Sequence, residues 1–175
     1  MALEKRDHRA LALWAADCAG HVLPTFETQY PDDKRPREAI EAGRAWARMA
    51  NGNSRNCLEF LGESEGASDS LASSELTLAQ VRAAAFAAHA AARDADNPAA
   101  RAAARAAAHA AATAHVAGHA RRAADYAVKA VAYSACTTEA DVAAAEERER
   151  QVLRLPAHLR SAVYLPTISP LMARD

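Results

Sequence analysis

Residues 97–134 read NPAARAAARAAAHAAATAHVAGHARRAADYAVKAVAYS, a stretch that consists mostly of alanine. Alanine has the highest intrinsic helix propensity of all residues. Asn97 followed by Pro98 is typical of a helix start, with a capping side chain before a proline in the first turn. The stretch therefore predicts closely packed helices whose shared core contains little bulk.

The same pattern continues without a proline to about residue 135, which is long for one helix in a chain of 175 residues. At about 1.5 Å per residue, an unbroken helix would reach roughly 60 Å, too long for one domain of this mass. We therefore expect a break near residues 113–118 and two separate helices.

Apolar residues at helical spacing predict further helices on both sides of this stretch. Asp7 is a candidate cap for the first, which Pro24 should kink or end. Thr77 is a candidate cap for the third, and Thr137 or Thr138 for the last. No segment shows the alternation of a strand, so the sequence predicts an all-α bundle of about six helices. The helices outside the alanine-rich stretch are expected at residues 7–23, 35–50, 78–95 and 137–153, followed by a short turn at 158–164.

One domain is expected, because a chain of this length can bury a continuous core. Residues 52–76 are rich in Ser, Glu, Gly and Asn and predict a polar loop or insertion, while residues 165–175 predict an irregular tail. Aromatic residues make up only 5 % of the chain. We therefore expect a few large side chains to anchor the core: Trp14, Phe26, Trp46, Phe86, Tyr126 and Tyr133.

Charge and cysteine content favour a cytoplasmic protein without nucleic-acid or membrane partners. The formal net charge is −1, which gives no basic footprint for nucleic acid or anionic lipid. No run approaches the ~20 apolar residues of a membrane span, and no secretory leader is visible. Three widely spaced cysteines, Cys18, Cys57 and Cys136, support neither a disulfide framework nor a zinc finger. No cofactor is predicted.

Histidines within alanine-rich segments are the best internal indication of a site. An imidazole in such a place must reach solvent or find a hydrogen-bond partner. His115 and His119 are four residues apart, a spacing that suits a metal, but Val116 stands where a zincin motif has its glutamate. They are therefore weak metal candidates, and histidines satisfied by neighbouring groups are the favoured interpretation. His21 and His89 could converge with the pair, whereas His109 lies about 120° away on a continuous helix.

Other polar residues offer alternatives for a catalytic or binding role. Asp17 and His21 could act as an orienting carboxylate and a general base, although a surface pair is the simpler interpretation. No recognised catalytic motif is present, so an enzymatic role stays open without being favoured. Arg101, Arg105 and His109 form a basic line that we expect to be solvated. The remaining ligand-binding or partner-binding candidates are Trp14, Arg44, Trp46, His89, His115, His119 and Tyr126.

Four segments together resemble a known family: LALWAADCA at 11–19, DKRPREAIEA at 33–42, RAAAFAAHAAAR at 82–93 and ATAHVAGHA at 112–120. The set resembles the Imm5-like immunity proteins of bacteria and archaea. The resemblance covers most of the chain except residues 52–76 and the tail. A second departure is Glu149-Arg150-Gln151, where an aromatic residue is expected before the glutamine. The resemblance implies an all-helical protein that neutralises a cognate toxin.

Three functions follow as hypotheses. The first is a binding protein that neutralises a toxin, for which the segment 52–76 and the arginines of the second helix, Arg37, Arg44 and Arg48, could supply a surface. The second is an enzyme or a ligand-binding protein, in which Asp17 and His21 would transfer protons and His115 and His119 would hold a ligand or metal. The third is a structural helical module that forms homo-oligomers.

Overall fold

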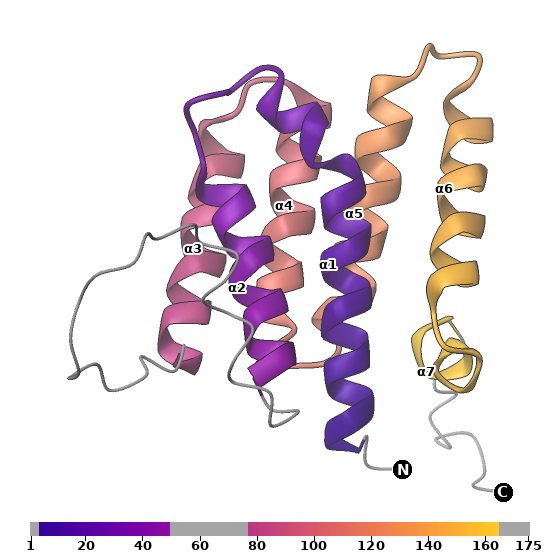
Figure 1. Cartoon of the computed structure of the whole chain (residues 1–175). Helices are drawn as coiled ribbons and strands as arrows, with labels where there is room; N and C mark the ends of the chain where they lie inside the picture. The colour runs from indigo at the N-terminus through magenta and orange to yellow at the C-terminus, as the bar shows by residue number, and fades with distance from the viewer. Residues whose placement is uncertain (1–3, 50–76, 165–175) are drawn as a thin grey trace, which may run out of the picture.

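The computed structural model describes residues 4–49 and 77–164, which form helices and no strand (Figure 1). The predicted all-α fold is confirmed. The loop and the tail predicted at 52–76 and 165–175 lie outside the described residues. The elements are α1 (Lys5–Glu27), α2 (Arg35–Met49), α3 (Leu78–Asp94), α4 (Pro98–Ala112), α5 (His119–Ser134), α6 (Ala140–Arg154), a 3-10 turn η1 (Ala157–Leu159) and α7 (Arg160–Tyr164).

The starts of α3 and α4 follow the sequence signals, and the start of α6 does not. Thr77 accepts a hydrogen bond from the Gln80 N–H and the Gln80 side chain binds back, so a capping box starts α3. Asn97 accepts from the Ala100 N–H and caps α4 as predicted. The predicted cap of the last helix is wrong: α6 starts at Ala140, and no side chain caps it.

Helix α1 is longer at both ends than its sequence signals predict. It starts after Glu4, so Asp7 lies in the first turn instead of capping it, and it includes Pro24. Pro24 lies in the last turn, and its carbonyl oxygen accepts hydrogen bonds from both the N–H (3.0 Å) and the hydroxyl (2.8 Å) of Thr28. Phe26 is buried in the core. Burial of Phe26 keeps this turn helical despite the proline.

Helix α4 is the centre of the bundle. Eleven of its fifteen residues are buried, and all eleven are alanine. It packs against α1, α2, α3 and α5, and in Figure 1 it lies behind α1 and α2, between α3 and α5. The predicted break is confirmed, because α4 ends at Ala112 and α5 begins at His119. The side chains of α4 that are only half-buried are Arg101, Arg105 and His109.

The predicted aromatic anchors divide into three groups. Trp14 and Phe26 are buried, whereas Trp46 and Tyr126 are half-buried. The prediction is wrong for Phe86 and Tyr133, which are 66 % and 60 % exposed. The stripes of α3 and α5 that face the core consist mainly of alanine. Because alanine also supplies the facing side of α4, the helices lie too close together for a phenyl ring between them.

Gly43 lies where α2 packs closely against the backbone of α4. A Cβ atom at this position would lie 3.3 Å from the Cα of Ala111 and 3.4 Å from the carbonyl oxygen of Ala110. Both atoms belong to the backbone of α4, which contacts α1, α3 and α5 as well as α2 and therefore cannot easily move away from α2. Gly20 differs, because a Cβ atom there would meet the end of the flexible Arg44 side chain, 3.0 Å from Nη2.

We therefore expect Gly43→Ala to lower the free energy of unfolding by about 1–2 kcal/mol, because overpacking outweighs the better helix propensity of alanine. Chemical denaturation with far-ultraviolet circular dichroism measures this change. Gly20→Ala is the matched control and should leave stability unchanged or raise it, since the Arg44 side chain can move away. Equal effects of the two substitutions would contradict a close contact at Gly43.

Candidate functional site

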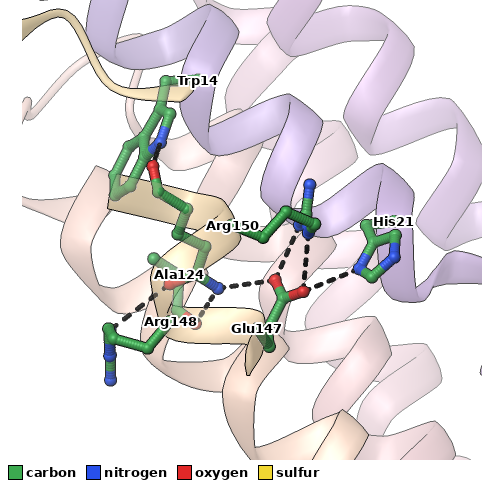
Figure 2. Close-up of polar contacts among 7 residues, drawn as sticks. Trp14, His21, Ala124, Glu147, Arg148 and Arg150 are labelled. Atoms are coloured by element: carbon green, nitrogen blue, oxygen red, sulfur yellow. Dashed lines mark hydrogen bonds and ion pairs between the residues drawn. The ribbon is translucent and has the colours of Figure 1, made fainter. Parts of the chain in front are cut away.

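Helix α6 joins the bundle through polar side chains. Its buried residues are Glu147 and Gln151, while the apolar side chains of Val142 and Leu153 are 60 % and 69 % exposed. A buried charge is expensive unless every oxygen is hydrogen-bonded. Figure 2 shows that the Glu147 carboxylate lies between the side chains of Arg150 and His21. Gln151 also donates to this carboxylate.

The Glu147 carboxylate is fully engaged. Arg150 donates from Nε and Nη2 to its two oxygens at 2.7 Å, and Gln151 Nε2 donates at 2.8 Å. His21 Nδ1 lies 2.8 Å from Oε2. Burial alone raises the pKa of this carboxyl, but the hydrogen bonds from Arg150 and Gln151 outweigh burial and hold the pKa below its usual value. Glu147 is therefore charged at neutral pH, although its side chain is only 1 % exposed.

Gln151 extends this arrangement to two other helices. Its side-chain N–H group donates to the carbonyl oxygen of Ala124 in α5 at 3.0 Å. Its backbone carbonyl oxygen accepts from the Trp14 indole in α1 at 2.9 Å; Trp14 and Ala124 are labelled in Figure 2. Arg148 adds an ion pair to Asp125 of α5 at 3.0 Å. We call the set Trp14, His21, Glu147, Arg150 and Gln151 the polar clamp; it fixes α6 against α1 and α5.

Glu147→Ala should lower the free energy of unfolding by about 3 kcal/mol, because it leaves the half-buried Arg150 guanidinium and the buried Gln151 amide without this acceptor. Hydrogen exchange should become faster in α6 and the adjoining turn before the rest of the bundle is affected. The exposed neighbour Glu149 offers the control: Glu149→Ala should change stability by less than ~0.5 kcal/mol. Uniform exchange throughout the bundle in Glu147→Ala would mean that the clamp does not hold α6.

A cleft of about 310 Å³ lies where α1, α2 and the end of α6 meet. Its polar lining includes the predicted residues Asp17, His21 and Arg44. Asp17 accepts from Arg44 Nη2 at 3.1 Å, whereas His21 is bound to Glu147. The carboxylate that orients His21 is thus Glu147 instead of Asp17, which corrects the predicted pairing. Sequence reasoning missed Glu147 because it stands in the charged run EERER, which is typical of a solvated face.

A second group of side chains gathers on α3, α4, α5 and the turn between α4 and α5. The ring of His109 lies 5.1 Å from that of His89, 5.2 Å from that of His119 and 5.3 Å from that of Tyr126, measured between centroids. His115 lies 5.4 Å from His119. The rings of His109 and Tyr126 are nearly parallel, at 9°. We call these four histidines and Tyr126 the histidine cluster.

Two predictions about the histidines need correction. His109 belongs to the cluster, although the helical spacing separated it from His115. The reason is the break after Ala112, which turns the chain back so that His119 meets His109, with 3.1 Å between their Nδ1 atoms. His21 does not join, because the polar clamp holds it. His89 does join, but no group of three or more His, Cys, Asp or Glu among the described residues is arranged to hold a metal.

The cluster disfavours protonation. Burial, followed by the charges of His89, His119, Arg122 and Arg105, lowers the pKa of His109 to about 4. Burial is also the largest cause of the lowered pKa values of His89, His115 and His119, and nearby arginines add to it. The hydrogen bond between His109 and His119 requires one Nδ1 to donate and the other to accept. Protonation of both rings would set two donors against each other.

The folded pKa values of these histidines lie below the ordinary value of 6.5, so the unfolded chain binds more protons between pH 6.5 and about 4. Stability should be fully present above pH 6.5 and should fall as the pH drops through this range. In His109→Gln, the loss of melting temperature between pH 7.5 and 5 should be smaller than in the unchanged protein, by roughly 2–4 °C. Parallel losses in calorimetry would show that the cluster is not the cause.

The remaining predicted binding residues are two tryptophans, Arg44 and Tyr126, and they lie in different parts of the bundle. Trp14 is 3 % exposed and serves the polar clamp, so its ring is not available to a partner. Trp46 is half-buried on α2 and lies 5.3 Å from the ring of His8. Arg44 lies in the cleft, and Tyr126 lies in the histidine cluster. The structure thus places Asp17, His21 and Arg44 in the cleft and His89, His115, His119 and Tyr126 in the histidine cluster, whereas Trp14 and Trp46 lie in neither.

A comparison with protein families settles what kind of chain this is. A family model described as "Imm-5 like putative immunity protein" matches residues 1–52 and 64–158. The chain belongs to this family. The resemblance inferred from the sequence is confirmed, and the interruption of the match lies inside the segment predicted as an insertion. The matched range includes both the polar clamp and the histidine cluster.

The chain was also compared with curated proteins and with solved structures. No curated protein and no solved structure gave a significant match. None of the described helices has an apolar stretch of the length and hydropathy needed to cross a membrane.

Proposed function

We propose that this protein is an immunity protein that binds a partner toxin protein and neutralises it. The observation that carries the proposal is its membership of an immunity protein family over most of the chain. The surface of the bundle also has the anchors that a protein interface uses. Large apolar side chains are exposed on α3 and α5, among them Phe86 and Tyr133.

The proposed mechanism is stoichiometric blocking by a preformed surface. Helix α4 is enclosed by four helices, and the polar clamp holds α6, so the positions of exposed side chains are set before a partner arrives. A surface that is already ordered loses little conformational entropy on binding. We place this activity in the cytoplasm, which the free thiols of Cys18 and Cys136 support.

The second candidate function is that of a small-molecule binder or enzyme, and the cleft favours it. Asp17, His21 and Arg44 line this cleft together with Arg154, a cation at the end of α6. A carboxylate, an imidazole and guanidinium groups around one concave surface suit a small anionic ligand. The geometry of this candidate depends on the polar clamp, because Glu147 orients His21.

The proposed function predicts a toxin gene beside the gene of this protein, and the toxin domain that such a gene encodes is the probe for the test. Cells that express the toxin domain alone should stop growing, and co-expression of this protein should restore growth. Native mass spectrometry of the co-purified material should give a complex of defined stoichiometry with the toxin domain. Growth arrest that co-expression does not relieve, with no complex, would refute the proposal. A bound small molecule in place of a protein would favour the cleft instead.

A further inference from the structure

Positive charge is concentrated on three neighbouring helices. Together α3, α4 and α5 contain seven Lys and Arg residues and two Asp residues, a formal charge of +5, in a chain whose formal net charge is −1. The remainder of the chain is therefore acidic. Charge of one sign that gathers on part of a nearly neutral protein is a feature of a recognition surface.

The two aspartates of these helices are paired with arginines of the neighbouring helices α2 and α6. Asp94 accepts from Arg35 of α2 at 2.8 Å. Asp125 pairs with Arg148 of α6 at 3.0 Å and with Arg121 at 3.8 Å. Both carboxylates are thus occupied by the neighbouring helices α2 and α6. Within the described parts of α3, α4 and α5, no carboxylate remains to balance the cations on the other side.

The unbalanced cations form one surface. At 100° per residue, Arg82, Phe86, His89 and Arg93 fall on one stripe of α3, and His119, Arg122, Tyr126, Lys129 and Tyr133 fall on one stripe of α5. Arg101, Arg105 and His109 run between them along α4. Ring contacts connect the three helices, because His89 and Tyr126 both pack on His109. We call these three stripes the basic face.

Aromatic groups on the basic face are held by cations or left exposed. The Arg105 guanidinium lies 5.6 Å and the Lys129 ammonium 5.0 Å from the centroid of Tyr126. Phe86 and Tyr133, on the two outer helices, expose 66 % and 60 % of their surface. A polar, cationic centre flanked by two large exposed rings offers anchors for both charged and apolar groups of a partner.

We propose that the basic face is the toxin-docking surface and that it recognises an acidic patch of a protein, with carboxylates opposite α4 and α5 and apolar groups against Phe86 and Tyr133. This proposal rests on the proposed function and names the chemistry of its partner. Charge complementarity is the argument, since carboxylates would supply the counter-charges that the face lacks. The lowered pKa values of its histidines reflect burial together with the same excess of positive charge.

Two other occupants fit the face less well. A second copy that used the same face in a two-fold dimer would place cations opposite cations, because such an interface is self-complementary. Nucleic acid needs neutralisation of many phosphates, and the acidic remainder of this chain would repel the strand beyond the face. An acidic patch of a folded protein has a limited extent and meets neither difficulty.

The test uses a defined acidic probe, a labelled copolymer of glutamate and tyrosine, whose binding is followed by fluorescence anisotropy at 0.15 M salt. The double variant Arg93→Glu with Lys129→Glu should weaken binding at least tenfold. Arg6→Glu with Lys34→Glu is the matched control, since it changes the net charge equally at two exposed cations outside the face. This control should retain binding within twofold. Circular dichroism confirms that both variants fold.

The apolar anchors have their own pair of variants. Phe86→Ala with Tyr133→Ala should weaken binding several-fold, whereas Val142→Ala with Leu153→Ala on α6 should not. Absent copolymer binding, or equal weakening in face and control variants, would overturn the proposal. Tighter binding of a single-stranded oligonucleotide by the same residues, or a dimer that Phe86→Ala with Tyr133→Ala dissociates, would overturn it in favour of another occupant.

The toxin complex separates this proposal from the function on which it rests. When the toxin domain binds, the face variants should lose protection of growth, and the control variants should keep it. Protection by the face variants would refute the docking surface and leave the immunity function standing. A protein that binds the copolymer through the face but protects against no toxin would refute the function and leave the acidic specificity of the surface.

Discussion

Contact between α4 and four other helices is the constraint on which this structure depends. Each of those helices approaches closely because alanine presents only a methyl group. Such contacts exclude water from the helix backbones but bury little apolar area per residue, so they specify geometry more than they supply stability. The larger buried side chains lie mainly on α1, where Leu11, Trp14, Val22, Leu23 and Phe26 face the core.

The small size of the alanine side chains also explains why α6 is attached by hydrogen bonds. With small side chains on α5, there is no deep apolar pocket for α6 to fill. Instead, Glu147 binds His21, the Gln151 side chain donates to the Ala124 carbonyl, and the Gln151 backbone carbonyl accepts from Trp14. Hydrogen bonds are directional, so this attachment tolerates fewer positions of α6 than an apolar surface would. Helix α5 therefore contributes to two polar regions, the clamp and the basic face.

Local signals in the sequence predicted the fold well, because caps and breaks act over a few residues. Thr77, Asn97 and the break before His119 all depend on neighbours in the chain. Burial was harder to predict. In an alanine-rich helix every face looks apolar, so periodicity could not show that Phe86 lies outside. Glu147 looked solvated because its partners come from α1 as well as α6, and His109 was misplaced because the break redirects its neighbour. Long-range packing decides all three.

The ridge formed by Arg101, Arg105 and His109 has a consequence for how such proteins diverge. Eleven positions of α4 accept nothing larger than alanine without displacing a neighbouring helix, whereas these three side chains reach the surface and constrain no helix contact in the core. Different positions of α4 thus determine the packing of the bundle and the chemistry of its surface. Substitution of these three half-buried residues can change what the surface attracts while the alanine interior stays unchanged, so one scaffold can present different binding surfaces.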